Sequence, residues 1–186
     1  GVGIIDAPVS GGHVAAESGN LNIMVGGSKD VFEHMKPILS VIGKRLDFVG
    51  ELGMGLTIKL INNIVGVTDM FLTIEALATG VRNNVRIDTL LSILDAGSAS
   101  NFYIRNWPVS KKFFSDFAKD INSARNNLFL SIKDLTHAQE LADLKNDSSP
   151  LLKGLIEALK EMTPESLVKA WSDINVAIKA DDLIKG

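Results

Sequence analysis

The stretch from Met54 to Arg82 limits the fold more than any other, because its pattern is helical throughout and would extend about 45 Å at 1.5 Å per residue. No convincing strand pattern follows Leu52. Further helical runs follow instead, over residues 88–94, 120–144, 151–162 and 163–180. We therefore predict that residues 51–186 form an all-α domain built on one long helix.

The first 50 residues have a different pattern, in which strands surround one helix. The strand-like runs are Val2–Val9, Leu21–Val25 and Arg45–Val49, and Ser28 is placed to cap a helix that ends near Ile42. This order is typical of the end of an α/β sheet. Because the chain opens directly in a strand, we expect residues 1–50 to be the remnant of a truncated α/β domain, and the chain to be the C-terminal portion of a longer protein. The fold class is therefore mainly α.

Composition argues against several classes of partner. With 46% hydrophobic and 22% charged residues, the 186-residue chain has the balance of a soluble globular protein. A net charge of −3 argues against binding nucleic acid. The absence of cysteine excludes disulfides and thiolate metal sites and fits a cytoplasmic chain. We expect no membrane partner, because Asp69 and Glu75 interrupt the longest apolar run before it reaches the roughly 18 residues that span a bilayer.

Lys59 is the first candidate for chemistry. Lys59 and Asn63 are four residues apart, so they lie on one helical face, and Asn62 and Gly66 extend this polar and small stripe. An ammonium group among apolar neighbours is partly desolvated, which lowers its pKa and suits it to proton transfer. The alternative is that Lys59 extends to water from an ordinary amphipathic helix and that the asparagines make structural contacts between helices.

Ser10, Gly11 and Gly12 form a second candidate, a turn directly after the first strand. Glycines in such a turn let backbone N–H groups approach an anion closely, and the serine hydroxyl adds a donor. The turn could therefore hold a substrate carboxylate. The alternative is a plain connecting loop.

Other motifs carry less information. Lys119 precedes Asp120, which is placed near the start of a long helix, where an acid is favoured, so a simple helix cap accounts for the pair. The three histidines at positions 13, 34 and 137 lack the spacing of metal ligands, and we predict no metal site. The dinucleotide fingerprint G-x-G-x-x-G is absent from the sequence.

Taken in order, these motifs resemble the β-hydroxyacid dehydrogenase family, which includes 3-hydroxyisobutyrate dehydrogenase, tartronate semialdehyde reductase and glyoxylate or succinic semialdehyde reductases. The segment from Asp6 to Gly12, Asp-Ala-Pro-Val-Ser-Gly-Gly, resembles its substrate motif. Gly53-x-Gly55-x-x-x-Lys59-x-x-x-Asn63 is similar to its catalytic motif, and Lys119-Asp120 is similar to its cofactor-side motif. The match spans residues 1 to about 125. The family's first nucleotide-binding units, of the Rossmann type, are missing here.

The resemblance implies a role for each motif. Lys59 would be the general acid when a carbonyl is reduced and the general base in the reverse direction. Lys119 would contact the cofactor, NAD or NADP. Five residues would bind and orient the carboxylate substrate: Ser10, Gly11, Gly12, Asn62 and Asn63. The choice of cofactor and of 3-hydroxy acid stays open, because the residue that recognises the ribose belongs to the missing units.

The resemblance also implies a homo-oligomer that forms through the helical domain. Without the pyrophosphate site, the 186 residues alone should bind NAD(P) poorly and should be inactive. The alternative is a non-catalytic helical dimerisation or scaffold module that derives from the same family.

Overall fold

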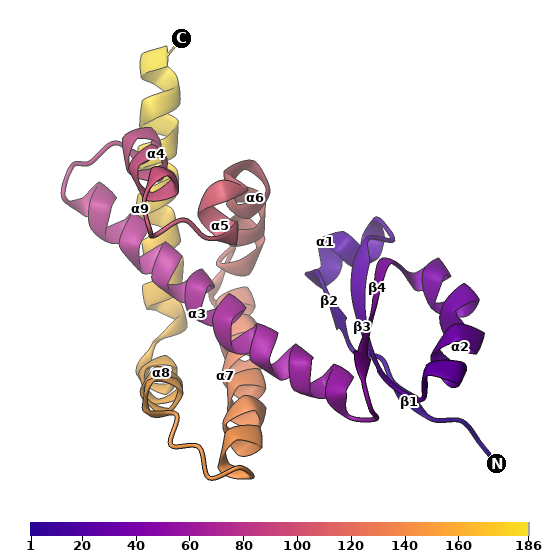
Figure 1. Ribbon diagram of the computed structural model, residues 1–186. Helices are drawn as coiled ribbons and strands as arrows, with labels where there is room; N and C mark the ends of the chain where they lie inside the picture. The colour runs from indigo at the N-terminus through magenta and orange to yellow at the C-terminus, as the bar shows by residue number, and fades with distance from the viewer. Residues whose placement is uncertain (186) are drawn as a thin grey trace. The chain divides into compact units, whose positions relative to one another are not determined.

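The computed structural model describes the backbone of residues 1–185 and the side chains of these residues except 13, 14, 184 and 185. The chain divides into two compact units (Figure 1). The N-terminal unit is residues 1–63, and the helical unit begins at Ile64. The division falls inside the long helix α3 (Met54–Arg82), which has the bounds that its pattern predicts. The predicted fold class, mainly α with a small α/β part followed by a long helical region, is confirmed.

The N-terminal unit is a small mixed sheet with helix α2 (Lys29–Ile42) packed on it. The sheet has four strands in the described part of the chain: β1 (Ile5–Asp6), β2 (Val9–Ser10), β3 (Leu21–Gly27) and β4 (Gly43–Gly50). The parallel partners β3 and β4 are joined through α2, as in the βαβ units of α/β folds. The core of the N-terminal unit contains Ile23, Val25, Phe32 and Leu39.

The prediction of one continuous strand over Val2–Val9 is wrong, because the structure divides this segment into β1 and β2. Both strands pair antiparallel with the same edge of β3, and Ala7 and Pro8 separate them. A proline cannot donate to a ladder hydrogen bond, so a strand is interrupted there. The carbonyl of Pro8 still accepts from the Met24 N–H at 3.0 Å, which keeps the segment against β3. The short helix α1 (Gly12–Glu17), which follows, was not predicted.

The helical unit contains the rest of α3 and a set of shorter helices. Their bounds are α4 (Ile87–Ala96), α5 (Phe102–Arg105), α6 (Trp107–Phe117), α7 (Ile121–Asp143), α8 (Pro150–Glu161) and α9 (Pro164–Lys185). Helix α7 packs against α8 and α9, and α4 packs against α9. Four of these helices were predicted, although α9 continues past residue 180. Helices α5 and α6 were not predicted, and their aromatic side chains contribute to a core that includes Phe71, Phe114 and Trp171.

By length and composition alone, α3 would be able to cross a membrane, unlike any other helix in the described part of the chain. The expectation that Asp69 and Glu75 rule this out was therefore too strict. The core helix of a soluble protein meets the same criterion, and α3 contributes the buried residues Phe71, Ile74 and Leu77 to the core.

Candidate active site

The turn predicted to bind a carboxylate is built on two glycines with positive φ. Ser10 ends β2, and Gly11 and Gly12 follow with φ of 127° and 66°. Residues other than glycine rarely adopt these backbone angles. A Cβ on Gly12 would have no atom within 4 Å, whereas one on Gly11 would lie 2.5 Å from the Cβ of Ala15. The turn is therefore open beside Gly12, where a small anion could approach the backbone.

Asn22, in the strand β3 beside this turn, is a further candidate that was not predicted from the sequence. It pairs with Ser10 in the ladder between β2 and β3, so the two side chains lie on the same face of the sheet. Its Oδ1 is buried and has no hydrogen-bond partner. Buried acceptors are nearly always satisfied in folded proteins, so this oxygen can accept from a ligand or a water molecule. The only signal in the sequence was an asparagine inside an otherwise apolar strand.

Three candidate residues lie on α3, within about one turn of one another. Lys59 and Asn63 are partly buried, and Asn62 is exposed. Partial burial of Lys59 agrees with the desolvation expected for a proton-transfer group. Its lowered pKa and its catalytic role stay predictions.

The first turn of α3 is held by Asp6, which lies on β1. Oδ1 of Asp6 accepts from the Gly53 N–H and Oδ2 from the Leu56 N–H, both at 2.7 Å. Helix N-termini leave backbone donors without partners, and a carboxylate is the acceptor that satisfies them best. Gly53 has no side chain with which to cap the helix, so the cap comes from 47 residues earlier in the chain. The segment of the predicted substrate turn and the helix of Lys59 are therefore directly joined.

The carboxylate of Asp6 fits only because two glycines surround it. A Cβ on Gly55 would lie 2.6 Å from Oδ2 of Asp6 and 2.5 Å from the carbonyl oxygen of Met24. A Cβ on Gly26, in β3, would overlap Oδ1 of the same carboxylate and would lie 2.7 Å from the carbonyl oxygen of Glu51. The second glycine of the Gly53-x-Gly55 motif is thus explained by close packing against the sheet.

Lys119 belongs to the helical unit and is exposed. It directly precedes Asp120, whose side chain caps α7 by accepting from the Ser123 N–H at 2.8 Å. This backbone hydrogen bond is the main reason why the pKa of Asp120 is below its usual value, and the charge of Lys119 adds to the effect. The predicted helix cap is confirmed, and cofactor binding by Lys119 stays a prediction.

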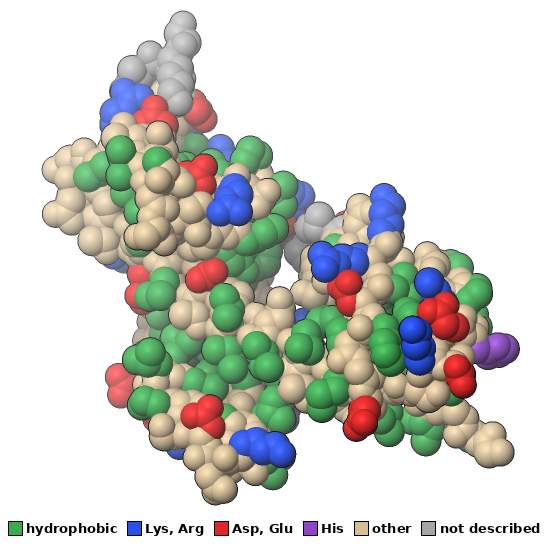
Figure 2. Space-filling model, viewed as in Figure 1, with side chains coloured by type: hydrophobic (Ala, Val, Ile, Leu, Met, Phe, Trp, Pro, Cys, Tyr) green, Lys and Arg blue, Asp and Glu red, His purple; other side chains and the backbone are tan. Residues whose placement is uncertain are grey.

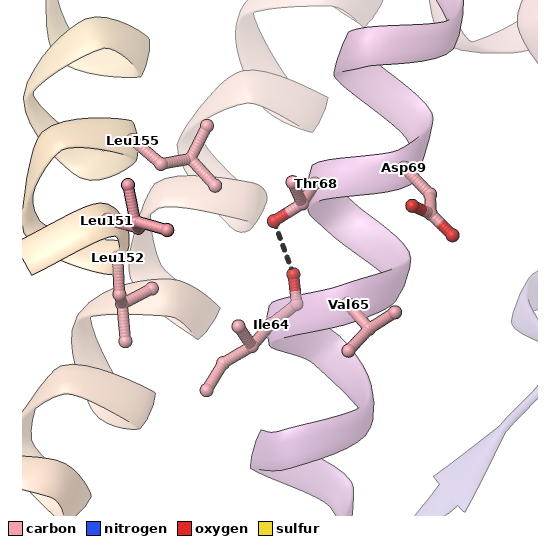
Figure 3. Close-up of a pocket in the computed structure, with 7 residues that line it drawn as sticks. All are labelled: Ile64, Val65, Thr68, Asp69, Leu151, Leu152 and Leu155. Carbon is pink, nitrogen blue, oxygen red and sulfur yellow. Dashed lines mark hydrogen bonds between the residues drawn. The ribbon is translucent and has the colours of Figure 1, made fainter. Parts of the chain in front are cut away.

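An apolar groove of about 300 Å³ lies within the helical unit, between α3 and α8. Figure 3 shows Ile64 and Thr68 of α3 on the side toward three leucines of α8, Leu151, Leu152 and Leu155. The groove contains none of the predicted site residues. Its lining suits an apolar side chain of a partner better than a small carboxylate. Among the described residues, no group of His, Asp and Glu could hold a metal ion, and the side chain of His13 lies outside the described residues.

Two protein-family models match the chain. Residues 1–50 match the NAD binding domain of 6-phosphogluconate dehydrogenase. Residues 53–179 match the model described as NAD-binding of NADP-dependent 3-hydroxyisobutyrate dehydrogenase. The second match covers more than half of the chain and includes Lys59, Asn62, Asn63 and Lys119.

Curated relatives agree with these models. The chain is 38% identical over 125 residues to 2-(hydroxymethyl)glutarate dehydrogenase of Eubacterium barkeri, which covers 65% of this chain and 42% of that protein. It is 33% identical over 172 residues to a probable mitochondrial 3-hydroxyisobutyrate dehydrogenase of Arabidopsis thaliana, which covers 87% of this chain and 47% of that protein. The chain therefore spans about half the length of the curated relatives that it matches.

A solved structure has the same fold. The chain superposes on 3-hydroxyisobutyrate dehydrogenase of Mycobacterium tuberculosis, solved with L-serine, with a TM-score of 0.68 and 20% identity. The match covers 89% of this chain and 60% of that one.

Proposed function

Because this chain belongs to the β-hydroxyacid dehydrogenase family, we propose that it supplies the substrate and catalytic half of an oxidoreductase. The reaction is hydride transfer between NAD(P) and a small 3-hydroxy acid, or reduction of the matching semialdehyde. The relatives support this substrate class, because 2-(hydroxymethyl)glutarate and 3-hydroxyisobutyrate both carry a hydroxymethyl group on the carbon next to a carboxylate.

The observation that carries the proposal is the direct connection between the two candidate motifs. Asp6 lies four residues before Ser10 in one segment of the sheet and caps the helix in which Lys59 is the sixth residue. The positive φ values of Gly11 and Gly12 support a turn whose backbone N–H groups bind a carboxylate. Asn63, with Asn62, supplies amide groups that can orient the rest of the substrate.

In the reductive direction, Lys59 as an ammonium donates a proton to the carbonyl oxygen and stabilises the charge that develops there. The nicotinamide, when bound, supplies the hydride for the carbonyl carbon and is itself oxidised. In the oxidative direction, neutral Lys59 takes the hydroxyl proton. Partial burial of Lys59 supports this role, since the amine is then only partly open to bulk water.

The residues present fit only part of a dinucleotide site. Lys119 offers an exposed positive charge to the cofactor. The sequence has no G-x-G-x-x-G turn, the element that places helix N–H groups against a pyrophosphate. We therefore propose that the 186 residues alone bind NAD(P) weakly and do not turn over, which calorimetric titration with each cofactor tests.

Replacement of Lys59 tests the proposed chemistry. In the complete reading frame, NADH or NADPH oxidation is followed with a panel of small semialdehydes, and the reverse reaction with 3-hydroxyisobutyrate and 2-(hydroxymethyl)glutarate. Lys59→Met should lower kcat by about 10²- to 10⁴-fold, the usual contribution of general acid–base catalysis. Circular dichroism should stay unchanged.

Lys29→Met is the matched control, because Lys29 is an exposed lysine at the start of α2 in the same unit. It should leave kcat unchanged. Full turnover by Lys59→Met would overturn the role of Lys59 as general acid and base. Absence of turnover by the unchanged protein with every substrate would favour the alternative of a non-catalytic dimerisation or scaffold module.

We also propose that the chain associates with a second copy through its helical unit. Support comes from apolar side chains that are exposed on α3, α7 and α8, namely Val65, Phe129, Leu130 and Leu151. Figure 2 shows hydrophobic side chains at the surface between charged groups. Leu151, at the groove between α3 and α8, is 89% exposed, which is unfavourable for a leucine that stays in water.

Light scattering tests the association. Leu151→Lys should shift the protein toward monomer, because a charge would then be buried in the interface. Val176→Lys, at an exposed position of α9, is the control and should keep the state of the unchanged protein. A dimer that survives Leu151→Lys would place the interface elsewhere.

A further inference from the structure

We propose that Asp6 is a positioning residue of the site, which sets the place of Lys59 relative to the Ser10–Gly12 turn. This inference rests on the proposed function, since it assigns a residue that acts through Lys59. None of the motif roles implied by the sequence gave Asp6 a task of its own. The contacts of its carboxylate supply one.

The first step is the position of Asp6 in the sheet. Its strand β1 pairs with the end of β3, Asp6 opposite Gly26, and the pairing resumes at Val9 opposite Ile23. Between them, the Pro8 carbonyl accepts from Met24. The backbone that leads from Asp6 to Ser10 is therefore held to one strand along its length and has little freedom to shift.

The second step is the contact that Asp6 makes with the start of the helix α3. Its carboxylate accepts two hydrogen bonds of 2.7 Å, one from the N–H of Gly53 directly before α3 and one from the N–H of Leu56 in the first turn of α3. Leu56 and Lys59 are three residues apart and are thus neighbours on the helix surface. A shift in the first turn would be passed on to Lys59, because the helix backbone is stiff over such a distance.

The third step is the fit around the carboxylate. Gly26 of the strand β3 and Gly55 of the helix α3 both leave room for the carboxylate, because neither has a side chain. A Cβ on Gly55 would also lie 3.0 Å from the ring Cδ of Pro8. Helix and sheet approach so closely that a single added Cβ at either glycine would displace the carboxylate. Charge-assisted hydrogen bonds to a helix N-terminus are also stronger than neutral ones. Asp6 therefore fixes the register of the helix on the sheet as well as satisfying its donors.

Three variants separate positioning from simple capping. Asp6→Ala removes both acceptors. Asp6→Asn keeps the shape and one acceptor oxygen, so it should partly restore what Asp6→Ala loses. Gly55→Ala keeps the carboxylate and its charge but displaces it. Gly154→Ala, at an exposed position of helix α8, is the control, because a Cβ there has no atom within 4 Å.

The measurement is steady-state kinetics of the complete reading frame. Asp6→Ala and Gly55→Ala should lower kcat by about a hundredfold, the effect of a misplacement of about 1 Å at a reacting group. The KM for NAD(P) should stay within about twofold, because the cofactor does not depend on this contact. A KM that rises with unchanged kcat, or full activity in folded Asp6→Ala, would overturn the inference while leaving the proposed function intact.

A second measurement needs no activity. Hydrogen exchange of residues 53–60 should be at least about tenfold faster in Asp6→Asn and Gly55→Ala than in the unchanged chain, because their N–H groups open more readily. Gly154→Ala should leave it unchanged. If no substrate of the panel is turned over by the unchanged protein, the proposed function fails. Unaltered exchange in both variants would overturn the inference about Asp6.

Discussion

The side-chain amide of Asn101 donates to the hydroxyl of Thr73 at 2.9 Å, which joins the start of α5 to the middle of α3. The other end of the same amide accepts from the Ile104 N–H at 3.1 Å and caps α5. Thr73 is only 3% exposed, so its hydroxyl has no water with which to replace this partner. One asparagine therefore satisfies two groups that would otherwise be unpaired.

Asn101→Ala should lower the free energy of unfolding by about 2 kcal/mol, because the helix loses its cap and a buried hydroxyl loses its partner. Asn101→Asp should lower it by less, since a carboxylate still accepts from Ile104 and can accept from Thr73. Urea unfolding of both variants measures the difference. Equal stability of Asn101→Ala and the unchanged protein would show that the contact contributes nothing.

The ion pair of Arg82 with Asp173 predicts a dependence of stability on pH. Nε of Arg82 donates to the Asp173 carboxylate at 2.8 Å, from the last turn of α3 to α9, and this hydrogen bond is the main cause of the lowered pKa of Asp173. A folded-state pKa below the unfolded value stabilises the protein above that unfolded value, 3.8, and the contribution is lost as pH falls through the folded pKa. Because both side chains are partly exposed, we expect only about 0.5 kcal/mol.

Asp173→Asn should therefore destabilise the protein at pH 7 and make progressively less difference below pH of about 4. Denaturant unfolding of the variant and the unchanged protein at both pH values measures this. A difference that is as large at low pH as at neutral pH would rule out the carboxylate as its source.

Much of this fold follows from local pattern. The long run of α3 carries no proline, and Asp120 and the Ser-Pro and Thr-Pro pairs mark the starts of three further helices. Ser149 directly precedes Pro150, the first residue of α8, and so stands where a cap residue is expected, but its φ is 35° and its side chain makes no cap hydrogen bond. The position of a cap residue thus predicted the helix start without predicting the contact.

The candidate site was only partly visible in the sequence, since its organising contact joins Asp6 to donors 47 and 50 residues away. A signal was nevertheless present. The long helix starts after a glycine, with no side chain of its own to satisfy its first donors, and a distant acceptor is then required. The short helices α5 and α6 escaped prediction because their spacing is set by aromatic packing around Phe114.

Two leucines of α3 should respond differently to truncation. Leu77 is fully buried, and Leu72 is 55% exposed, so the same change on the same helix differs only in burial. Leu77→Ala should cost about 3 kcal/mol, because it removes apolar contact and leaves a cavity. Leu72→Ala should stay within about 0.5 kcal/mol. Denaturant midpoints that match in the two variants would contradict the core described for the helical unit.

Tyr103 makes the ionisation of a single side chain measurable, because it is the only tyrosine in the sequence. Burial, with the negative charge of Asp69 as a second cause, raises its pKa from 10.0 to about 12. The native state therefore holds the phenol proton more tightly than the unfolded state does. This contribution to stability is fully present below pH 10.0 and is lost as pH rises toward about 12.

The absorbance of tyrosinate should accordingly appear about two pH units later in the folded protein than in urea, and unfolding should accompany it. Asp69→Asn removes the smaller cause, so its midpoint should fall only part of the way and stay above 10.0. Circular dichroism at each pH separates ionisation in the folded state from ionisation after unfolding. A midpoint near 10.0 in protein that is still folded would mean that the phenol is open to water, and the packing of Tyr103 against Phe113 and Phe114 would then be wrong.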